Sequence, residues 1–175
     1  MIAALVLIGA PGTGKSSVLD ALATLLEREG VEHGALESEE LTRGFPPLSN
    51  AILAEQLAHA MALQRRAGRR LFLVAFTPES EAELQSVVAA TGAERTLLAC
   101  LRAPTEAIAA RLREREPDRW PGKEALIAHA RALSGTVPAL DGIDLTLDTD
   151  GREAEQLART VLEAMRERGL LARRA

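Results

Sequence analysis

Cysteine and aromatic residues are scarce in this chain, and each scarcity excludes a class of function. The single cysteine, Cys100, excludes disulfides and cysteine-based zinc sites within the chain, and its apolar neighbours predict a small buried side chain. Aromatic residues make up 2% of the sequence and tyrosine is absent, so few rings exist on which nucleic-acid bases could stack. The net charge of −4 also disfavours nucleic-acid binding.

Long apolar runs are missing as well. No apolar stretch approaches the length of a membrane span, and Met1 leads directly into an apolar run typical of a strand rather than of a signal peptide. We therefore expect a cytoplasmic protein that does not act on a membrane. The 175 residues, 47% of them hydrophobic, suit a single domain with a sizeable core, and no repeat or long linker divides them.

The segment GAPGTGKS, residues 9–16, carries the strongest functional signal. It fits the pattern G-x-x-x-x-G-K-[ST], follows an apolar run and leads into a helical pattern, and in this context the pattern indicates phosphate binding. Its glycines allow the chain to curl so that successive N–H groups point at an anion, and the following helix N-terminus adds partial positive charge.

Lysine is nearly absent, which gives weight to the lysine in this segment. Lys15 and Lys123 are the only lysines in a chain that otherwise uses arginine. Lys15 is expected to reach the outer phosphates, and the Ser16 hydroxyl to bind Mg²⁺. The residues expected to hold the nucleoside triphosphate are Gly9, Pro11, Gly12, Thr13, Gly14, Lys15, Ser16 and Ser17.

Strand and helix patterns alternate along the chain. Apolar runs predict strands at 3–8, 31–36, 71–76, 96–101 and 143–147, and amphipathic stretches predict helices at about 15–30, 49–68, 77–90, 104–116, 123–133 and 152–168. The helix at 77–90 is expected to begin with Thr77 as its N-cap and Pro78 in its first turn. Right-handed crossovers then give an α/β fold with a five-stranded parallel sheet covered on both faces. Ligands in such sheets bind beyond the carboxyl ends of the strands.

An acidic cluster follows the second predicted strand. Glu37 and Glu39 are expected to face the terminal phosphate held by Lys15, where a phosphoryl acceptor must lie. A carboxylate there can take the proton of the acceptor, and we favour Glu37, which is nearer to the strand end, over Glu39 as this base. Arg43 either anchors an anionic group of the acceptor or pairs with the acidic cluster. The alternative is that the whole acidic cluster is an exposed turn without a catalytic role.

Three arginines, Arg111, Arg115 and Arg119, are spaced by four residues around the fourth helix. On a lid at about 111–124 that closes over the triphosphate, they would spread the charge that develops on the transferred group. The competing interpretation is a solvated helix face with glutamate partners.

Thr149 and Gly151 follow the fifth strand, in a position to wrap the base of the nucleotide, and a turn with a helix cap explains them equally well. The histidines lack metal-ligand spacing, so we assign them no role.

Together, the phosphate loop, the acidic cluster and the arginine helix resemble the P-loop kinases of small molecules. These include the nucleoside monophosphate, gluconate, shikimate and adenylylsulfate kinases and chloramphenicol phosphotransferase, and the resemblance covers nearly the whole chain in its order of elements. It implies a three-layer P-loop NTPase fold with strand order 2-3-1-4-5 and a short lid, ATP and Mg²⁺ as cofactors, and transfer of the γ-phosphoryl group to a small molecule. The implied catalytic residues are Lys15, Glu37, Glu39, Arg111 and Arg115, and the implied acceptor-binding residues are Glu37, Glu39, Arg43 and Arg119.

Departures from this family leave the acceptor open. Glutamates stand where the family usually has aspartate, and the third strand ends without the acidic Mg²⁺ ligand of many other P-loop NTPases. Our main hypothesis is an ATP-dependent kinase acting on a hydroxyl or phosphate of an unidentified small molecule. The alternatives are a nucleoside monophosphate kinase and a nucleotide-binding regulatory module with little turnover.

Overall fold

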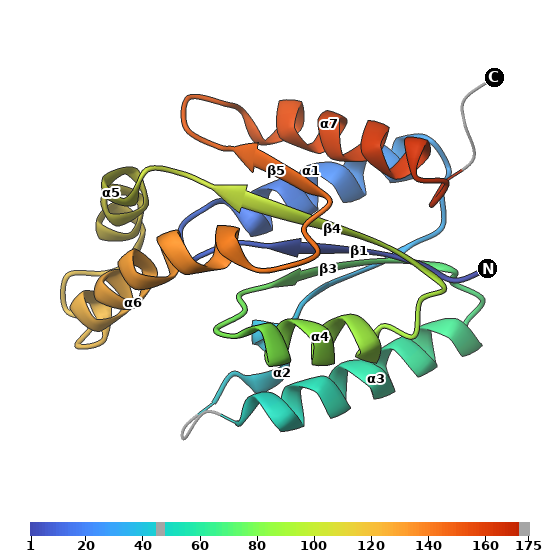
Figure 1. The fold of residues 1–175 in the computed structure, drawn as a ribbon, viewed down its shortest axis with the longest axis horizontal. Coiled ribbons are helices and arrows are strands. Elements are labelled where there is room, and N and C mark those ends of the chain that lie inside the picture. Colours follow the sequence, from blue (N-terminus) through green and yellow to red (C-terminus); the bar gives the residue numbers. More distant parts are fainter. Residues whose placement is uncertain (45–47, 172–175) are drawn as a thin grey trace.

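The computed structural model describes residues 1–44 and 48–171 and contains a parallel sheet in the predicted order (Figure 1). The strands run β2-β3-β1-β4-β5 across the sheet. Pairing aligns Ile8 at the end of β1 with Phe76 of β3 and Cys100 of β4, so the carboxyl ends of the central strands finish together. The strand bounds are β1 Ala3–Ile8, β2 Gly34–Glu37, β3 Leu71–Phe76, β4 Arg95–Arg102 and β5 Leu145–Asp148.

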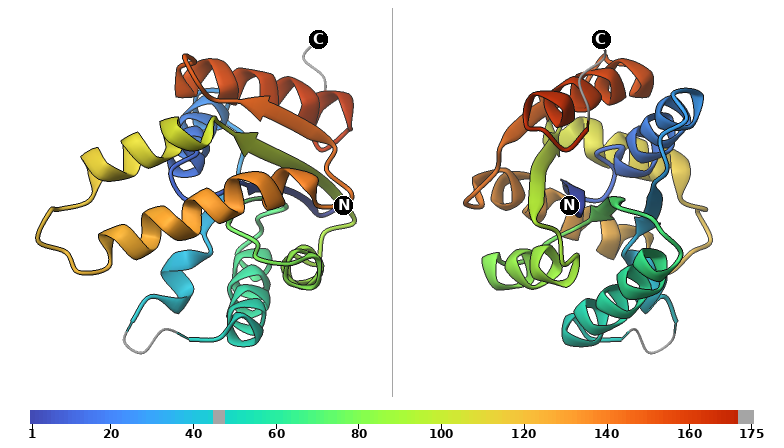
Figure 2. Two further views of the ribbon diagram at one scale, coloured as in Figure 1. Left: turned by 60° about the vertical axis from the view of Figure 1, so that its left-hand side comes forward. Right: turned by 90° about the vertical axis from the view of Figure 1, so that its right-hand side faces the viewer.

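Helices cover both faces of the sheet and complete the predicted three layers (Figure 2). On one face, α1 (Lys15–Arg28) and α7 (Ala154–Glu167) pack on the side chains of Leu5 and Leu7. On the other face, α3 (Asn50–Arg66), α4 (Glu81–Ala90), α5 (Thr105–Arg115) and α6 (Lys123–Thr136) pack around Val6 and Ile8. Successive side chains of β1 point alternately into the two apolar cores, as expected for a strand that is buried on both faces.

Helices α5 and α6 form a hairpin that projects past the carboxyl edge of the sheet (Figure 2). Its base is anchored in the core by Ile108 and Leu112 of α5 and by Ile127 and Ala130 of α6, all buried. The turn between the two helices lies within residues 111–124, the range expected to form a lid. None of the helices in the described part of the chain is long and apolar enough to cross a membrane.

Several element boundaries differ from the prediction. Strand β2 begins at Gly34 rather than at 31, because Val31 still belongs to the turn after α1, where its N–H donates to the carbonyl of Leu26. Two short elements were not predicted, α2 (Glu39–Thr42) and a 3-10 turn at Val137–Ala139.

The predicted start of α4 is wrong. The helix begins at Glu81, and Ser80 is its N-cap, with a side-chain oxygen that accepts a hydrogen bond from the Glu83 N–H. Ser80 has the extended backbone of a cap, whereas Thr77 lies before the helix and uses its hydroxyl elsewhere. The prediction that Cys100 is buried is confirmed, since its side chain has no exposed surface.

Candidate active site

The phosphate loop joins β1 to α1, and its glycines are required by backbone angles and close approach, as Gly14 and Gly9 illustrate. Gly14 has a φ of 93° directly before α1, a conformation that L side chains rarely adopt. A Cβ on Gly9 would lie 2.7 Å from the carbonyl oxygen of Leu101 and 2.5 Å from Thr13 Oγ1, so only glycine fits between β1 and β4. Thr13 is buried and its hydroxyl donates to the Ala10 carbonyl, which closes the loop.

The N-terminus of α1 has the properties of an anion site. No side chain caps it, and no acidic residue lies in its first turn. The first-turn N–H groups of a helix have no partner inside the helix, and together with the helix dipole they favour a negatively charged ligand. Helix α4 is the contrasting case, because Ser80 caps it and Glu81 and Glu83 occupy its first turn.

Lys15 is buried beside this helix terminus. Its Nζ donates to the carbonyl oxygens of Gly9 at 3.0 Å and Ala10 at 3.3 Å. Burial lowers the pKa of Lys15, whereas the carboxylates of Glu39 and Glu37 oppose this shift by raising it. The lysine and both predicted carboxylates therefore lie within electrostatic reach of one another.

Glu37 contacts the phosphate loop directly, since the Ser16 hydroxyl donates to its Oε2 at 2.8 Å. A hydroxyl oxygen beside a carboxylate oxygen suits Mg²⁺, which commonly takes one or two protein ligands together with substrate phosphates. No group of three or more His, Cys, Asp or Glu side chains able to hold a metal exists among the described residues, so a metal here would depend on the phosphates. The donors present fit Mg²⁺ bound with a nucleotide.

Glu39 binds Thr77 rather than Ser16. Its Oε1 accepts a hydrogen bond of 2.6 Å from the hydroxyl of Thr77, and it lines a pocket of about 960 Å³. Pro11 of the phosphate loop also lines this pocket, so the pocket lies directly beside the loop. The other polar lining residues outside α5, α6 and the turn between them are Ser38, Thr42, Arg43, Thr77 and Glu79. Apolar lining comes from Leu53, Phe76, Trp120, Leu126 and three prolines, Pro11, Pro117 and Pro121.

Ser38 lies in this wall between the two glutamates. Its N–H donates to the Ala75 carbonyl, but its Oγ is buried with no hydrogen-bond partner, the sole such side-chain atom in the part of the chain that the structure describes. Buried hydroxyls are nearly always hydrogen-bonded.

The predicted arginines separate into two locations. Arg115 and Arg119 line the large pocket from the lid, and Arg115 also pairs with Glu116. Arg43 lines the same pocket and pairs with Glu40 at 3.0 Å, so the structure joins it to the acidic cluster while leaving it at the pocket wall.

Arg111 lies on the other side of the phosphate loop. Its guanidinium donates to the Thr149 hydroxyl at 3.0 Å and to the Thr149 carbonyl at 3.1 Å, and it is 3.6 Å from Asp150. Arg111 and Thr149 line a smaller pocket of about 270 Å³ together with Thr13, Gly14 and Ser17. Gly151, with a φ of 66°, forms the turn that follows.

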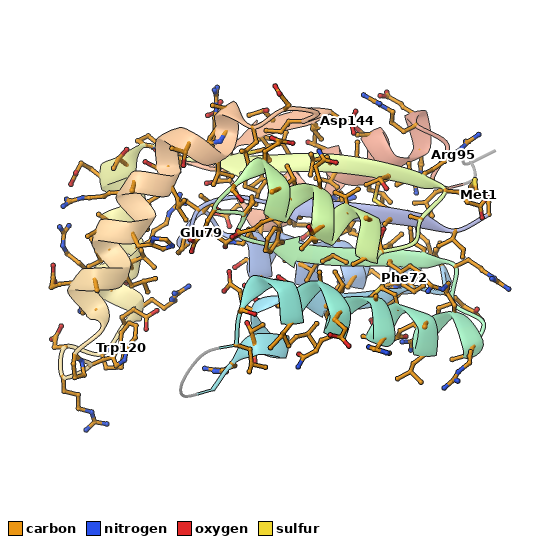
Figure 3. The ribbon with its side chains drawn as sticks, turned by 60° about the horizontal axis from the view of Figure 1, so that its bottom comes forward. Met1, Phe72, Glu79, Arg95, Trp120 and Asp144 are labelled. Carbon is orange, nitrogen blue, oxygen red and sulfur yellow. The ribbon has the colours of Figure 1, made fainter. Side chains whose placement is uncertain are left out.

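Thr77, Glu79 and His129 line the pocket, although the sequence analysis gave none of them a role in the site. Thr77 follows a predicted strand end, where ligands bind. The sequence assigns it to the helix instead, because Pro78 and Glu79 are typical of a first helical turn. His129 of α6 lies 3.2 Å from Glu79, and both line the pocket. Figure 3 shows Glu79 close to α6 and Trp120 at the far end of the hairpin. No local pattern predicts the role of His129, because packing alone brings α6 over the sheet edge.

No protein family and no curated protein sequence matches this chain, whereas solved structures do. The structure is similar to a sugar kinase from Janibacter sp., with a TM-score of 0.65 and 19% identity over 93% of this chain and 94% of that one. It is similar to APS kinase from Mycobacterium tuberculosis in complex with AMPPNP and APS, with a TM-score of 0.58 and 22% identity over 94% and 97% of the two chains. It is also similar to shikimate kinase from Acinetobacter baumannii in complex with shikimate, with a TM-score of 0.59 and 18% identity over 98% and 97%. The fold is thus that of the P-loop small-molecule kinases, as the sequence predicted.

Proposed function

We propose that this chain is a Mg·ATP-dependent phosphotransferase that moves the γ-phosphoryl group to a small molecule bound in the pocket of about 960 Å³. The observation that carries the proposal is the shared boundary of the two sites. Pro11 of the phosphate loop, Glu39 of α2 and Arg115 of α5 line one pocket, at the end of a loop suited to a triphosphate. The similar structures support it, since each is described as a kinase.

The nucleotide would lie along the phosphate loop. The first-turn amides of α1 and the Lys15 ammonium would hold its phosphates, and Arg111 and Thr149 would contact its base in the smaller pocket. Ser16 and Glu37, already 2.8 Å apart, would hold Mg²⁺ between them and the phosphates. When bound, the metal would neutralise charge on the β- and γ-phosphates.

Glu39 is the better-placed base. We infer that it takes the proton of the acceptor hydroxyl as that oxygen forms a bond to the γ-phosphorus and the bond to the leaving ADP oxygen breaks. The Thr77 hydroxyl donates to Glu39 Oε1, which leaves the other carboxylate oxygen for the acceptor. Glu37, our first choice from the sequence, is engaged with Ser16 instead.

The arginines of the lid would supply positive charge to the pocket. Arg115 would stabilise the charge on the transferred group, and Arg119 and Arg43 would anchor an anionic part of the acceptor. Arg119 has no ion-pair partner within the described residues, so its charge is available to a ligand.

Transfer of radiolabelled γ-phosphate from ATP to a panel containing gluconate, shikimate, adenylylsulfate, AMP and hydroxylated antibiotics tests this function. We expect one class of acceptor to be labelled and to stimulate ADP release, and Lys15→Ala to reduce the rate by at least about 10²-fold. Calorimetry with Mg·ATP and Mg·GTP is the companion measurement. Absence of heat with both nucleotides would refute the proposal, and binding without any labelled acceptor would favour a regulatory module.

A further inference from the structure

Lys123, the second of the two lysines, is buried at the base of the lid turn. It is the first residue of α6, and its side chain is 10% exposed. Its Nζ donates to the carbonyl oxygens of Arg113 at 2.7 Å and Glu116 at 2.9 Å and to Asp118 Oδ1 at 2.7 Å. All three ammonium hydrogens therefore have acceptors, and all three acceptors belong to the end of α5 and the turn after it.

The sequence explains why α5 needs this cation. In a continuing helix, the carbonyl of Arg113 would accept from the N–H four residues on, but that residue is Pro117, which has no N–H. Helix α5 ends at Arg115, and its last carbonyls require partners from elsewhere. Lys123 Nζ supplies the missing donor and places positive charge at the negative end of the helix.

We call the three hydrogen bonds from Lys123 Nζ to Arg113, Glu116 and Asp118 the clasp. The chemistry of this clasp requires lysine. An ammonium group offers three donors around a point, matching two carbonyls and a carboxylate that converge on it, whereas a guanidinium is a planar fork. The Asp118 side chain is otherwise exposed, and its hydrogen bond to Lys123 holds the pKa of Asp118 below its usual range. In a chain that uses arginine almost everywhere, this geometry accounts for the second lysine.

The turn itself is one hydrogen-bonded unit. The Trp120 N–H donates to the Pro117 carbonyl at 3.0 Å, and the Lys123 N–H donates to the Trp120 carbonyl at 3.2 Å. The Trp120 ring packs so closely on Gly122 that a Cβ there would lie 2.5 Å from it. The lid turn is thus folded around the Lys123 ammonium.

We propose that Lys123 is a positioning residue that holds Arg115 at the phosphoryl side of the pocket. Arg115 lies between Arg113 and Glu116, the two residues whose carbonyls Lys123 binds, so the clasp fixes the backbone on both sides of it. Arg115 in turn lines the pocket and is close enough to lower the pKa of Lys15, after the larger effects of burial and of the two glutamates. This role for Lys123 rests on the proposed function of Arg115.

Turnover of Mg·ATP with water as acceptor tests the coupling between the two residues. Lys123→Met is expected to lower kcat by up to about 10²-fold, because a small displacement of a charge-stabilising group costs that much, while the KM for Mg·ATP stays within about threefold. In an Arg115→Ala background, Lys123→Met should change kcat by less than about twofold. Additive losses, or full activity of Lys123→Met alone, would overturn the proposal. Arg131→Met, on the same helix with an exposed partner, is the matched control and should leave kcat unchanged.

A second readout needs no turnover. Trp120 is the only tryptophan, so its fluorescence reports on the lid turn alone. Lys123→Met should increase acrylamide quenching of Trp120, Asp118→Asn should do so to a smaller extent, and Arg131→Met should not. If wild-type protein transfers no phosphoryl group, the proposed function fails while quenching still tests the clasp. If Lys123→Met does not fold, Asp118→Asn decides, and unchanged quenching and kcat in that variant would contradict the proposal.

Discussion

At the scale of single residues, two glutamates separated by one position have different surroundings. Glu37 is the last residue of β2 and meets Ser16, whereas Glu39 is the first residue of α2 and meets Thr77. Ser38 between them has helical backbone angles, so the chain turns at the strand end and directs the two carboxylates to different sites. In the proposed function, Glu37 would face the metal and Glu39 the acceptor.

Substituting each glutamate should separate these roles. Glu39→Gln is expected to lower kcat by about 10²-fold or more and leave Mg·ATP affinity unchanged, because a base acts in the transition state. Glu37→Gln should instead raise the Mg²⁺ concentration needed for half-maximal rate. Initial rates over a Mg²⁺ titration, with calorimetry for affinity, measure both. The opposite pattern would restore Glu37 as the base and would remove Glu39 from the mechanism.

At the scale of elements, the start of α4 decides whether Thr77 serves the helix or the site. The sequence predicts the cap at Thr77, and the structure shows that Ser80, three residues later, also precedes an acidic residue that suits a first turn. The structure uses Ser80 as the cap, which leaves Thr77 at the end of β3 to donate to Glu39.

Matched substitutions distinguish the two positions. Ser80→Ala should lower the free energy of unfolding by about 1 kcal/mol, the usual cost of losing a side-chain cap, with kcat unchanged. Thr77→Val should lower kcat with a smaller loss of stability, because it removes the donor that orients Glu39. Urea unfolding and initial rates check the pair. If Thr77→Val instead lost about 1 kcal/mol of unfolding free energy and kept a normal kcat, Thr77 would be a helix cap and not a residue of the site.

Much of the element order could be predicted because local signals are strong at the core. The strands β1 and β3 match their predicted bounds, since each is a continuous apolar run that only a doubly covered parallel strand explains. The phosphate loop was equally predictable, because its glycines are dictated by backbone angles and close approach. The contact of Thr77 with Glu39, the pairing of His129 with Glu79 and the burial of Lys123 were not, because each depends on how segments separated in the sequence meet in space.

At the scale of the whole molecule, the candidate site is assembled by topology. Residues after β1, β2 and β3 and the end of α5 converge because the parallel strands finish at one edge and the α5–α6 hairpin extends beyond it. Kinases that share 22% identity or less with this chain share its fold. A likeness of that size does not identify the acceptor of the proposed reaction, which must be found by experiment.

The two buried lysines should have opposite effects on global stability. Burial lowers the pKa of Lys15 from its ordinary value of 10.5, so the folded state carries an unfavourable charge at neutral pH. Lys15→Met is expected to raise the free energy of unfolding by on the order of 1 kcal/mol and the Tm by about 2–4 °C. Lys123→Met should lower the Tm, because it leaves two carbonyls without their donor.

Two further conditions make the Lys15 prediction specific. Because the unfolded state holds the Lys15 proton more tightly, wild-type stability should rise relative to Lys15→Met as the pH increases toward 10.5, and the difference between the two should shrink. Mg·ATP at about 100 times its Kd should stabilise the wild type by about 2.7 kcal/mol and leave Lys15→Met unaffected. Calorimetric unfolding with and without Mg·ATP measures both effects. A lower Tm for Lys15→Met at neutral pH would mean that its bonds to Gly9 and Ala10 outweigh the cost of burying its charge, and that the loop is held together by the lysine it presents.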